Sequence, residues 1–492
     1  MRRSFSWESS QLNLIVIMLD SLRPDHLGCY GNPWIKTPNI DKFSREAVIF
    51  ERAYAEGLPT LPVRTALFTG RYTLMWRGWQ HLEPDDVTLA EILWDSGFTS
   101  AFITDTYHLH KPKMGYERGF DYVEFIRGQE ADPYIVDPNI KVDLSKWHPK
   151  NYFTERDKEV FIQYLRNRHD WESEEDHFIA KVVKAGIKWL ENQVKRGRKD
   201  KLFLWLDCFD PHEPWDPPEE YYDLYAPKEY NDLPIIQPFT RGEKGGFIEA
   251  FTELEVQHIR AQYAGEVTLV DKWIGLFFEK IKELELWDNS LIILLSDHGE
   301  PLGEHGIIRK VRPWPYEELS RIVLLMKFPN NEGEGKRVRA FVQTPDLLPT
   351  ILDFVKIPEK RSWWSVSPIL QGESLLPLVF DETESTRNTA IAGHFGRSWS
   401  IRDEEFSLYL WPRWKTSYTF GIGPIPKQEK LYIELYKIDR DYIPPRPSGW
   451  HAGSQSERNN VIDEFKEKAM ELELELRRKL MEIMSSAHSH MS

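Results

Sequence analysis

The hydrophobic positions of the chain form short apolar runs separated by longer stretches with helical spacing. Residues 12–19 are apolar apart from Asn13, and residues 202–206 and 291–295 form two further runs. Such short runs without alternating polar residues are typical of strands buried on both faces of a parallel sheet. The run at 13–19 is therefore the first predicted strand, and a shorter strand is predicted at 100–103.

Between these runs, apolar residues recur with the period of amphipathic helices. The pattern predicts helices at 40–47, 88–96, 176–194 and 253–283. At 88–96, Thr88 is followed by Glu91 three residues later, which is the spacing of a capping box. Strands that alternate with helices predict an α/β fold, in which a mostly parallel sheet is sandwiched by helices.

The pattern changes after residue 354. Residues 356–385 are rich in loop-forming residues. Residues 389–410 and 430–438 are typical of antiparallel strands, and residues 461–484 form a charged amphipathic helical pattern. We therefore predict an α/β domain at 1–385 and a smaller C-terminal subdomain at 386–492, with an antiparallel sheet and a terminal helix. Residues 127–175 are charged, aromatic and irregular, and are interpreted as an insertion over the active face.

Ionisable residues directly follow two of the predicted strands. Asp20 ends the first run, and Asp297 and His298 follow the run at 291–295. Ligands of open α/β sheets gather at the carboxyl ends of strands, and burying ionisable groups there is costly without a partner. Two carboxylates and one imidazole suit a hard or borderline divalent cation. We predict that these residues bind one Mn²⁺, Ca²⁺ or Mg²⁺ ion, and no residue is assigned to an organic cofactor.

Residues 57–72 predict a short helix with a hydroxyl at its start. Pro62 suits the first turn, Thr60 lies at or beside the N-cap, and Gly70 is placed to end the helix. Free N–H groups and the positive end of the dipole favour an anion there, and a hydroxyl that must ionise. Arg64 lies one turn further on and returns to the same place. On its own, a T-x-P-x-R segment is most often an ordinary capped helix.

Charge and composition restrict the partners. The formal net charge of −15 argues against nucleic-acid and anionic-membrane surfaces, so a site for an anionic substrate must be made locally positive. The apolar run at 12–19 is too short to span a membrane and lacks a cleavage site, which predicts a cytoplasmic protein. Cys29 and Cys208 are too few for a disulfide framework. An oligomer is compatible with the sequence.

Five segments of the chain form an ordered series. The segment with Thr60, Pro62 and Arg64 is one of them. The others are 13–39, which contains Asp20, 210–215 with a histidine, 296–310 with Asp297, His298 and Lys310, and 345–350. Together they resemble the sulfatase family of the alkaline phosphatase superfamily, whose nucleophile motif is Cys/Ser-x-Pro-x-Arg. The resemblance spans residues 12 to 460, and the order of the five motifs makes it specific.

The resemblance implies a catalytic role for four residues. Thr60 occupies the position of the nucleophile, whose hydroxyl a neighbouring metal would activate. Arg64 would stabilise charge on the transferred group by paired hydrogen bonds, and Lys310 would do so as a point charge. His212 would protonate the leaving group.

The resemblance also implies substrate contacts. Thr106 and His108 match the family's Lys-x-His segment, with Thr106 in the place of the lysine, and both would bind substrate. His305 is ambiguous, because a packing role and a site role are equally compatible with its position.

Two departures from the family pattern affect the chemistry. Sulfatases convert Cys or Ser to formylglycine, but Thr60 cannot become that aldehyde because its Cβ carries a methyl group. An intermediate on threonine must be cleared by direct attack of water, a route that serves phosphoryl groups. The family's Asp-Asp pair is Asp20-Ser21 here, and the mid-chain segment lacks an Asp-x-x-x-His, which favours a single metal.

The favoured interpretation is a metal-dependent hydrolase that cleaves a small anionic phosphate ester through a covalent Thr60 intermediate. The substrate would be a phosphodiester, a phosphomonoester or a phosphonate, as in phosphodiesterase and phosphonate monoester hydrolase-like relatives. A sulfuric ester hydrolase using unmodified Thr60 is one alternative, and a phosphotransferase is another. The last is an inactive member that keeps the fold and binds a metal or ligand.

Overall fold

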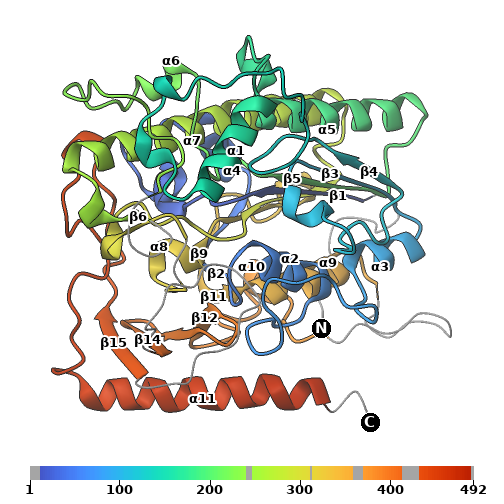
Figure 1. Cartoon of the computed structure of the whole chain (residues 1–492). Helices are drawn as coiled ribbons and strands as arrows, with labels where there is room; N and C mark the ends of the chain where they lie inside the picture. Colours follow the sequence, from blue (N-terminus) through green and yellow to red (C-terminus); the bar gives the residue numbers. More distant parts are fainter. Residues whose placement is uncertain (1–11, 240–245, 311–312, 358–369, 413–430, 489–492) are drawn as a thin grey trace.

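A mixed, mostly parallel sheet forms the centre of the molecule (Figure 1). The computed structural model describes residues 12–239, 246–310, 313–357, 370–412 and 431–488. The nine-stranded sheet has the order β11-β2-β10-β7-β1-β5-β3-β4, and β9 pairs with β2 outside this path. The strands are β1 (Asn13–Leu19), β2 (Val48–Tyr54), β3 (Thr99–Thr104), β4 (Tyr122–Phe125), β5 (Leu202–Cys208), β7 (Ser290–Ser296), β9 (Arg321–Ile322), β10 (Leu324–Lys327) and β11 (Arg337–Gln343).

The strands from β7 to β4 all run parallel, whereas β10 is antiparallel to both of its neighbours. This arrangement confirms the predicted fold class. The strands predicted from the apolar runs are present, each extended by a residue or two where the prediction stopped short. The half of the sheet formed by β2, β10 and β11 was not predicted, because its strands are short or carry charged residues such as Glu51 and Arg52.

Helices cover both faces of the sheet, and the side chains of β1 alternate between the two layers (Figure 1). Ile15 and Ile17 pack towards the layer of α1 (Pro38–Arg45), α5 (Phe178–Lys195) and α7 (Glu253–Glu283). Leu14 and Val16 pack towards the layer of α2 (Thr60–Thr69), α3 (Leu89–Asp95), α9 (Leu347–Phe354) and α10 (Leu376–Val379). A strand with apolar residues on both faces is thereby buried completely, as its sequence predicted.

The remaining short elements lie around this core. They are α4 (Glu155–Asn167), α6 (Glu219–Tyr222), α8 (Glu317–Ser320) and the two-stranded pair β6 (Gly246–Phe247) and β8 (Ile307–Ile308). In α4, Phe161 and Tyr164 pack on Phe178 and Ile236, so the segment predicted as an insertion at 127–175 is anchored to the main body. Within the ranges described above, no helix combines the length and the apolar composition that crossing a bilayer requires.

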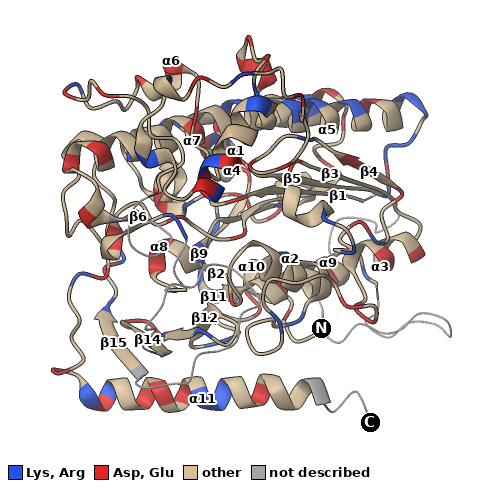
Figure 2. Cartoon of the chain, in the orientation of Figure 1, with Lys and Arg blue, Asp and Glu red and all other residues tan. Residues whose placement is uncertain are grey.

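A second, antiparallel sheet lies beside the first and carries the terminal helix α11 (Lys466–His488). Its order is β12 (Ala390–His394), β13 (Ser398–Arg402), β14 (Phe406–Pro412) and β15 (Leu431–Lys437). Leu472 and Leu476 of α11 pack on it, while charged residues of both signs occur along the helix (Figure 2). The divisions at 1–385 and 386–492 stay a prediction.

The terminal helix begins later than predicted. Val461 donates its N–H to the Leu435 carbonyl oxygen at 2.7 Å, and Asn460 bridges Tyr436, so this segment follows the edge of β15 before the helix starts. The helix continues to His488, beyond the predicted end at 484. The amphipathic pattern located the helix but did not reveal the backbone contacts that set its start.

Candidate active site

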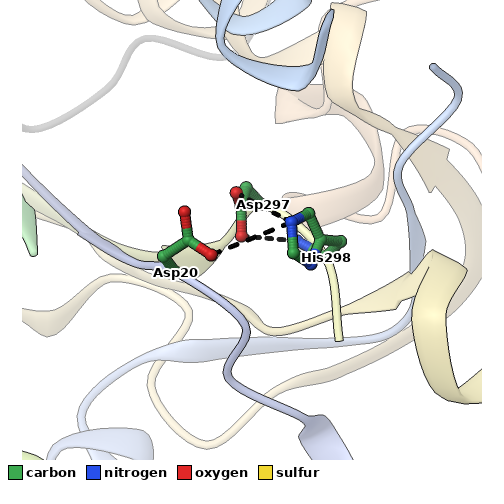
Figure 3. A group of neighbouring side chains, drawn as sticks. All are labelled: Asp20, Asp297 and His298. Carbon is green, nitrogen blue, oxygen red and sulfur yellow. Dashed lines mark hydrogen bonds and ion pairs between the residues drawn. The ribbon is translucent and has the colours of Figure 1, made fainter. Parts of the chain in front are cut away.

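Asp20, Asp297 and His298 converge at the carboxyl ends of two neighbouring strands (Figure 3). Asp20 follows β1, and the other two residues follow β7, which pairs with β1 in parallel. One ligand atom from each residue lies within 4.8 Å of the others, and all three side chains are fully buried. Sheet topology therefore brings together the residues that the sequence predicts as metal ligands.

The two carboxylates have opposite electrostatic environments. Burial and the neighbouring Asp297 raise the pKa of Asp20 well above its usual range. Burial also opposes ionisation of Asp297, but the charge of Arg64 and the hydrogen bond from the Ser21 N–H hold the pKa of that carboxyl below its usual range. The pair therefore concentrates negative charge that an added cation would stabilise.

His298 presents a lone pair to this group. Its Nδ1–H donates to the Gly299 carbonyl oxygen at 2.7 Å, which leaves Nε2 as the acceptor, and burial lowers its pKa to about 4. Asp20 Oδ2 is buried and accepts no hydrogen bond, and its contact is an ion pair with Arg64 Nη2 at 3.2 Å. Two carboxylates and a neutral imidazole nitrogen fit a divalent cation in donor type and charge.

Thr60 lies beside this group, at the start of α2. The helix begins at Thr60 and is preceded by Pro59, and Gly70 ends it in the left-handed conformation with φ 66°. This confirms the helix predicted in 57–72. Thr60 Oγ1 lies 3.2 Å from His298 Nε2 and is almost completely buried. The hydroxyl is thus next to the predicted metal ligands and at the positive end of a helix.

Arg64 crosses the site and pairs with three carboxylates. Its Nε and Nη2 donate to the two oxygens of Asp207 at 3.2 and 2.9 Å, and Nη1 donates to Asp297. Nη2 also lies 3.2 Å from Asp20 Oδ2. Arg64 therefore spans the predicted metal ligands and a further carboxylate.

That carboxylate, Asp207, was not among the predicted site residues. It is the penultimate residue of β5, whereas the predicted strand stopped at Leu206. The signal was available, because Asp207 is an ionisable residue at the end of an apolar run, as Asp20 is. Thr106 donates its hydroxyl to Asp207 Oδ1 at 2.7 Å and is fully buried. The threonine in the place of the family's lysine thus helps to position the partner of Arg64.

His108 lies near the site on the short helical turn Tyr107–His110. Its Nε2 is 2.8 Å from Glu130 Oε2, and Lys111 Nζ is 3.1 Å from its Nδ1. Its ring also lies 6.3 Å from that of Phe209, which in turn stacks on His212 at 3.9 Å. The two histidines predicted to act on substrate are therefore joined through one aromatic ring.

His212 is neutral in this environment. Burial is the main cause that lowers its pKa to about 3, and the Lys310 charge acts in the same direction. Its Nδ1 donates to the Glu213 carbonyl oxygen at 2.5 Å, so Nε2 carries the lone pair. An anion bound beside this ring would raise its pKa and favour protonation of Nε2.

Lys310 is connected to the carboxylate group through Ser21. Its ammonium donates to Ser21 Oγ at 3.1 Å, to Glu213 at 3.1 Å and to Glu300 at 2.8 Å. Ser21 donates its hydroxyl to Asp20 Oδ1 at 2.9 Å and its N–H to Asp297 Oδ1 at 3.1 Å. Ser21 has a φ of 65°, a left-handed conformation that costs a non-glycine residue energy. The residue in the place of the family's second aspartate thus fixes Asp20 and links it to Lys310.

His305 contacts two glutamates and a tyrosine outside the Asp20–Asp297–His298 group. Its Nδ1 lies 2.8 Å from Glu318 Oε1, its ring stacks on Tyr316 at 3.7 Å, and its Nε2 lies 4.0 Å from Glu457. Burial opposes its protonation, but Glu318 and Glu457 raise its pKa to about 9. The ambiguous histidine is therefore held as a cation between two acidic residues.

Comparisons with known proteins agree with this arrangement. A family model described as Sulfatase matches residues 12–357. The chain belongs to the sulfatase family. Its membership of the alkaline phosphatase superfamily is confirmed, and with it the expectation of a hydrolase that acts on ester bonds. Sulfatases typically bind a divalent metal ion, which suits the Asp20–Asp297–His298 group.

The similar proteins include sulfatases and a protein described as multifunctional. The chain is 25% identical to an arylsulfatase of Clostridium perfringens, over 88% of this chain and 92% of that protein. It is 26% identical to the multifunctional alkaline phosphatase superfamily protein PehA of Trinickia caryophylli, over 78% and 80%. The crystal structure of a phosphonate monoester hydrolase of Agrobacterium radiobacter superposes with a TM-score of 0.69 and 20% identity, covering 96% of both chains. The last comparison establishes the shared fold.

Proposed function

We propose that this sulfatase-family protein hydrolyses phosphoric or phosphonic esters by transferring the phosphoryl group to Thr60 Oγ1 and then to water. The observation that carries the proposal is the hydroxyl of Thr60, 3.2 Å from His298 and beside the two carboxylates. Because the threonine Cβ carries a methyl group, this nucleophile acts as an alcohol and not as an aldehyde hydrate. The multifunctional protein of Trinickia caryophylli and the phosphonate monoester hydrolase of Agrobacterium radiobacter support the choice of a phosphoric or phosphonic ester as substrate.

In the proposed reaction, Thr60, His212, Arg64 and Lys310 have separate roles. Thr60 Oγ1 loses its proton to solvent and forms the bond to phosphorus while the bond to the leaving oxygen breaks. His212, whose Nε2 takes up a proton when the bound anion raises its pKa, gives that proton to the leaving oxygen. Arg64 and Lys310 supply fixed positive charge in a buried site, where it acts strongly on the oxyanion. Water then attacks phosphorus, one of its protons passes to His212 Nε2, the bond to Thr60 breaks, and phosphate or phosphonate leaves. The Thr60 oxygen takes up a proton from solvent, which restores the hydroxyl. A divalent cation held by Asp20, Asp297 and His298 would lower the pKa of the Thr60 hydroxyl.

A second candidate is hydrolysis of sulfuric esters by unmodified Thr60. The observation that favours it is the number of sulfatases among the similar proteins, including the arylsulfatase of Clostridium perfringens and an N-acetylglucosamine-6-O-sulfatase of Bacteroides thetaiotaomicron. The same residues would act, with attack at sulfur. The two candidates differ in the ester that is turned over.

The test compares the purified protein with Thr60→Ala and Thr60→Ser on aryl phosphate, phosphodiester, phosphonate and sulfate esters, with added Mn²⁺, Ca²⁺ or Mg²⁺. Thr60→Ala is expected to lose roughly 10³-fold or more in kcat, as removal of a covalent nucleophile does. Thr60→Ser keeps the hydroxyl and is expected to retain substantial activity. Equal rates in wild type and Thr60→Ala would rule out the nucleophile, and faster turnover of sulfate esters would select the second candidate.

A further inference from the structure

The C-terminal sheet reaches the nucleophile segment through its first strand. Leu58 donates its N–H to the Gly393 carbonyl oxygen at 2.8 Å, and Gly393 donates its N–H to the Glu56 carbonyl oxygen at 2.9 Å. These bonds form a parallel bridge between Gly57 and Gly393. The end of β12 is therefore held beside Gly57 and Leu58, which precede Thr60 by two to three residues in the sequence.

His394, the last residue of β12, is buried next to this bridge with an unsatisfied ring nitrogen. Its exposed fraction is 7%, and Nε2 has no hydrogen-bond partner. A buried polar atom without a partner costs free energy, and at a site it indicates a missing ligand. Sequence reasoning missed this histidine because it belongs to no motif of the nucleophile or metal segments.

Ser398 indicates which nitrogen of His394 carries the proton. The backbone N–H of His394 donates to Ser398 Oγ at 3.2 Å, and Nδ1 lies 3.3 Å from the same oxygen. We assign the Ser398 hydroxyl hydrogen to the bond with Nδ1, because the same oxygen already accepts the backbone N–H of His394. Nδ1 is then the acceptor and the ring proton lies on Nε2. The unpartnered atom is thus an N–H donor, which suits an anion.

The ring of His394 interacts electrostatically with His298, one of the predicted metal ligands. Burial, followed by the charge of Arg397, lowers the pKa of His394 to about 3, so the ring is neutral. His298 is the residue whose Nε2 lies 3.2 Å from Thr60 Oγ1. The backbone bridge therefore places His394 at the wall of the site beside the segment of Thr60, and its interaction with His298 agrees with that position.

We propose that His394 is a further substrate-binding residue, whose Nε2–H donates a hydrogen bond to an oxygen of the tetrahedral oxyanion held over Thr60. This inference deepens the proposed function and rests on it for the identity of the site. The donor is neutral, so it adds directional recognition to the positive charge of Arg64 and Lys310. It also makes the C-terminal sheet a part of the active site.

The test uses isothermal titration of the full-length protein with inorganic phosphate and, separately, inorganic sulfate, in the presence of Mn²⁺. His394→Phe keeps a ring and removes the donor, and we expect it to weaken binding of the preferred anion about 10-fold or more. His394→Gln offers an amide N–H near the position of Nε2, and we expect it to stay within a few-fold of wild type. Ser398→Ala leaves the ring in place but frees its tautomer, and a few-fold weakening is expected.

Metal content and the thermal midpoint of unfolding are measured on every variant. Anion affinities are then compared only among variants that are folded and contain the metal ion. Wild-type affinity in His394→Phe would overturn the inference, as would failure of wild type to bind either anion. Equal losses in His394→Phe and His394→Gln would also overturn it, because a packing role and not a donor would then be responsible. Where an ester is turned over, KM is expected to rise more than kcat falls.

These outcomes separate the inference from the proposed function. Anion binding that depends on His394 in a protein that turns over no ester would support the inference and reject hydrolysis. Turnover that depends on Thr60 but is indifferent to His394→Phe would support hydrolysis and reject the inference. The preference for phosphate or sulfate distinguishes the two classes of oxyanion.

Discussion

Asp20 and Asp297 are identical carboxyl groups that one buried site holds in different electrostatic environments. Both carboxylates are fully buried at the ends of neighbouring strands. Asp297 receives the N–H groups of Ser21 and His298 and the guanidinium of Arg64, which stabilise its charge. Asp20 has one oxygen without a hydrogen-bond donor, and its pKa is raised by burial and by Asp297. Asp20 is therefore the carboxylate that depends most on an added cation.

The metal assignment gives a prediction with a matched control. Asp297→Asn removes one anionic ligand, and we expect the purified variant to lose most of its divalent metal in elemental analysis. Asp207→Asn alters an equally buried carboxylate that also binds Arg64 but lies outside the group of three. This control is expected to keep its metal while turnover falls. Full metal occupancy in Asp297→Asn would contradict the assignment.

Sequence alone revealed the residues whose position follows from local pattern. Asp20, Asp297 and His298 end apolar runs, and parallel strands bring such ends to one edge. Asp207 was missed because a boundary was placed too early on β5, and His394 because it comes from a distant sheet. Its place in the site depends on the bridge between Gly57 and Gly393, which no local pattern encodes.

At the scale of elements, strands and helices with strong periodicity were predicted closely. The strand β1 and the helix α7 have the predicted bounds, because a continuous apolar run and a long amphipathic period leave few alternatives. The strand β2 was missed because Glu51 and Arg52 interrupt its apolar residues. The charge of Glu51 is satisfied by Arg337 and Arg339 from the neighbouring strand β11, a partnership that only the sheet creates.

The helix α3 provides a test at this scale. Thr88 Oγ1 accepts the Glu91 N–H at 3.2 Å, and Glu91 accepts the Thr88 N–H at 2.8 Å, as the predicted capping box requires. Thr88→Ala removes this cap and is expected to cost about 1 kcal/mol, seen as a lower thermal midpoint. Thr88→Ser retains the hydroxyl and should stay close to wild type. Equal destabilisation by both variants would show that the methyl group, and not the cap, contributes.

For the molecule as a whole, the contact of His305 with Glu318 and Glu457 joins the main body to the C-terminal region. Glu318 lies on α8, whereas Glu457 accepts the hydroxyl of Tyr409 from β14 at 2.6 Å. His305 lies between them, and its side chain is 4% exposed. A single protonated imidazole thus stabilises the position of one part of the protein on the other.

This contact predicts a pH dependence of stability. The pKa of His305 is raised from 6.5 to about 9, so its charge stabilises the folded state fully below about pH 6.5. That stabilisation is lost as the pH rises through 9, and amounts to no more than about 3 kcal/mol. The thermal midpoint of wild type should therefore fall between pH 6.5 and 9 more steeply than that of His305→Gln. His451→Gln, at an exposed histidine, serves as the control. Parallel profiles in wild type and His305→Gln would contradict the prediction.

The bridge between Gly57 and Gly393 also has a consequence for biosynthesis. The segment that precedes Thr60 leaves the ribosome early, whereas its partner strand β12 follows only after the whole central sheet has been made. At usual elongation rates this interval lasts on the order of tens of seconds. Throughout that time the N–H of Leu58 and the carbonyl of Glu56 lack the partners that they have in the finished protein. The backbone contact that fixes the segment just before Thr60 therefore forms only late in the synthesis of the chain.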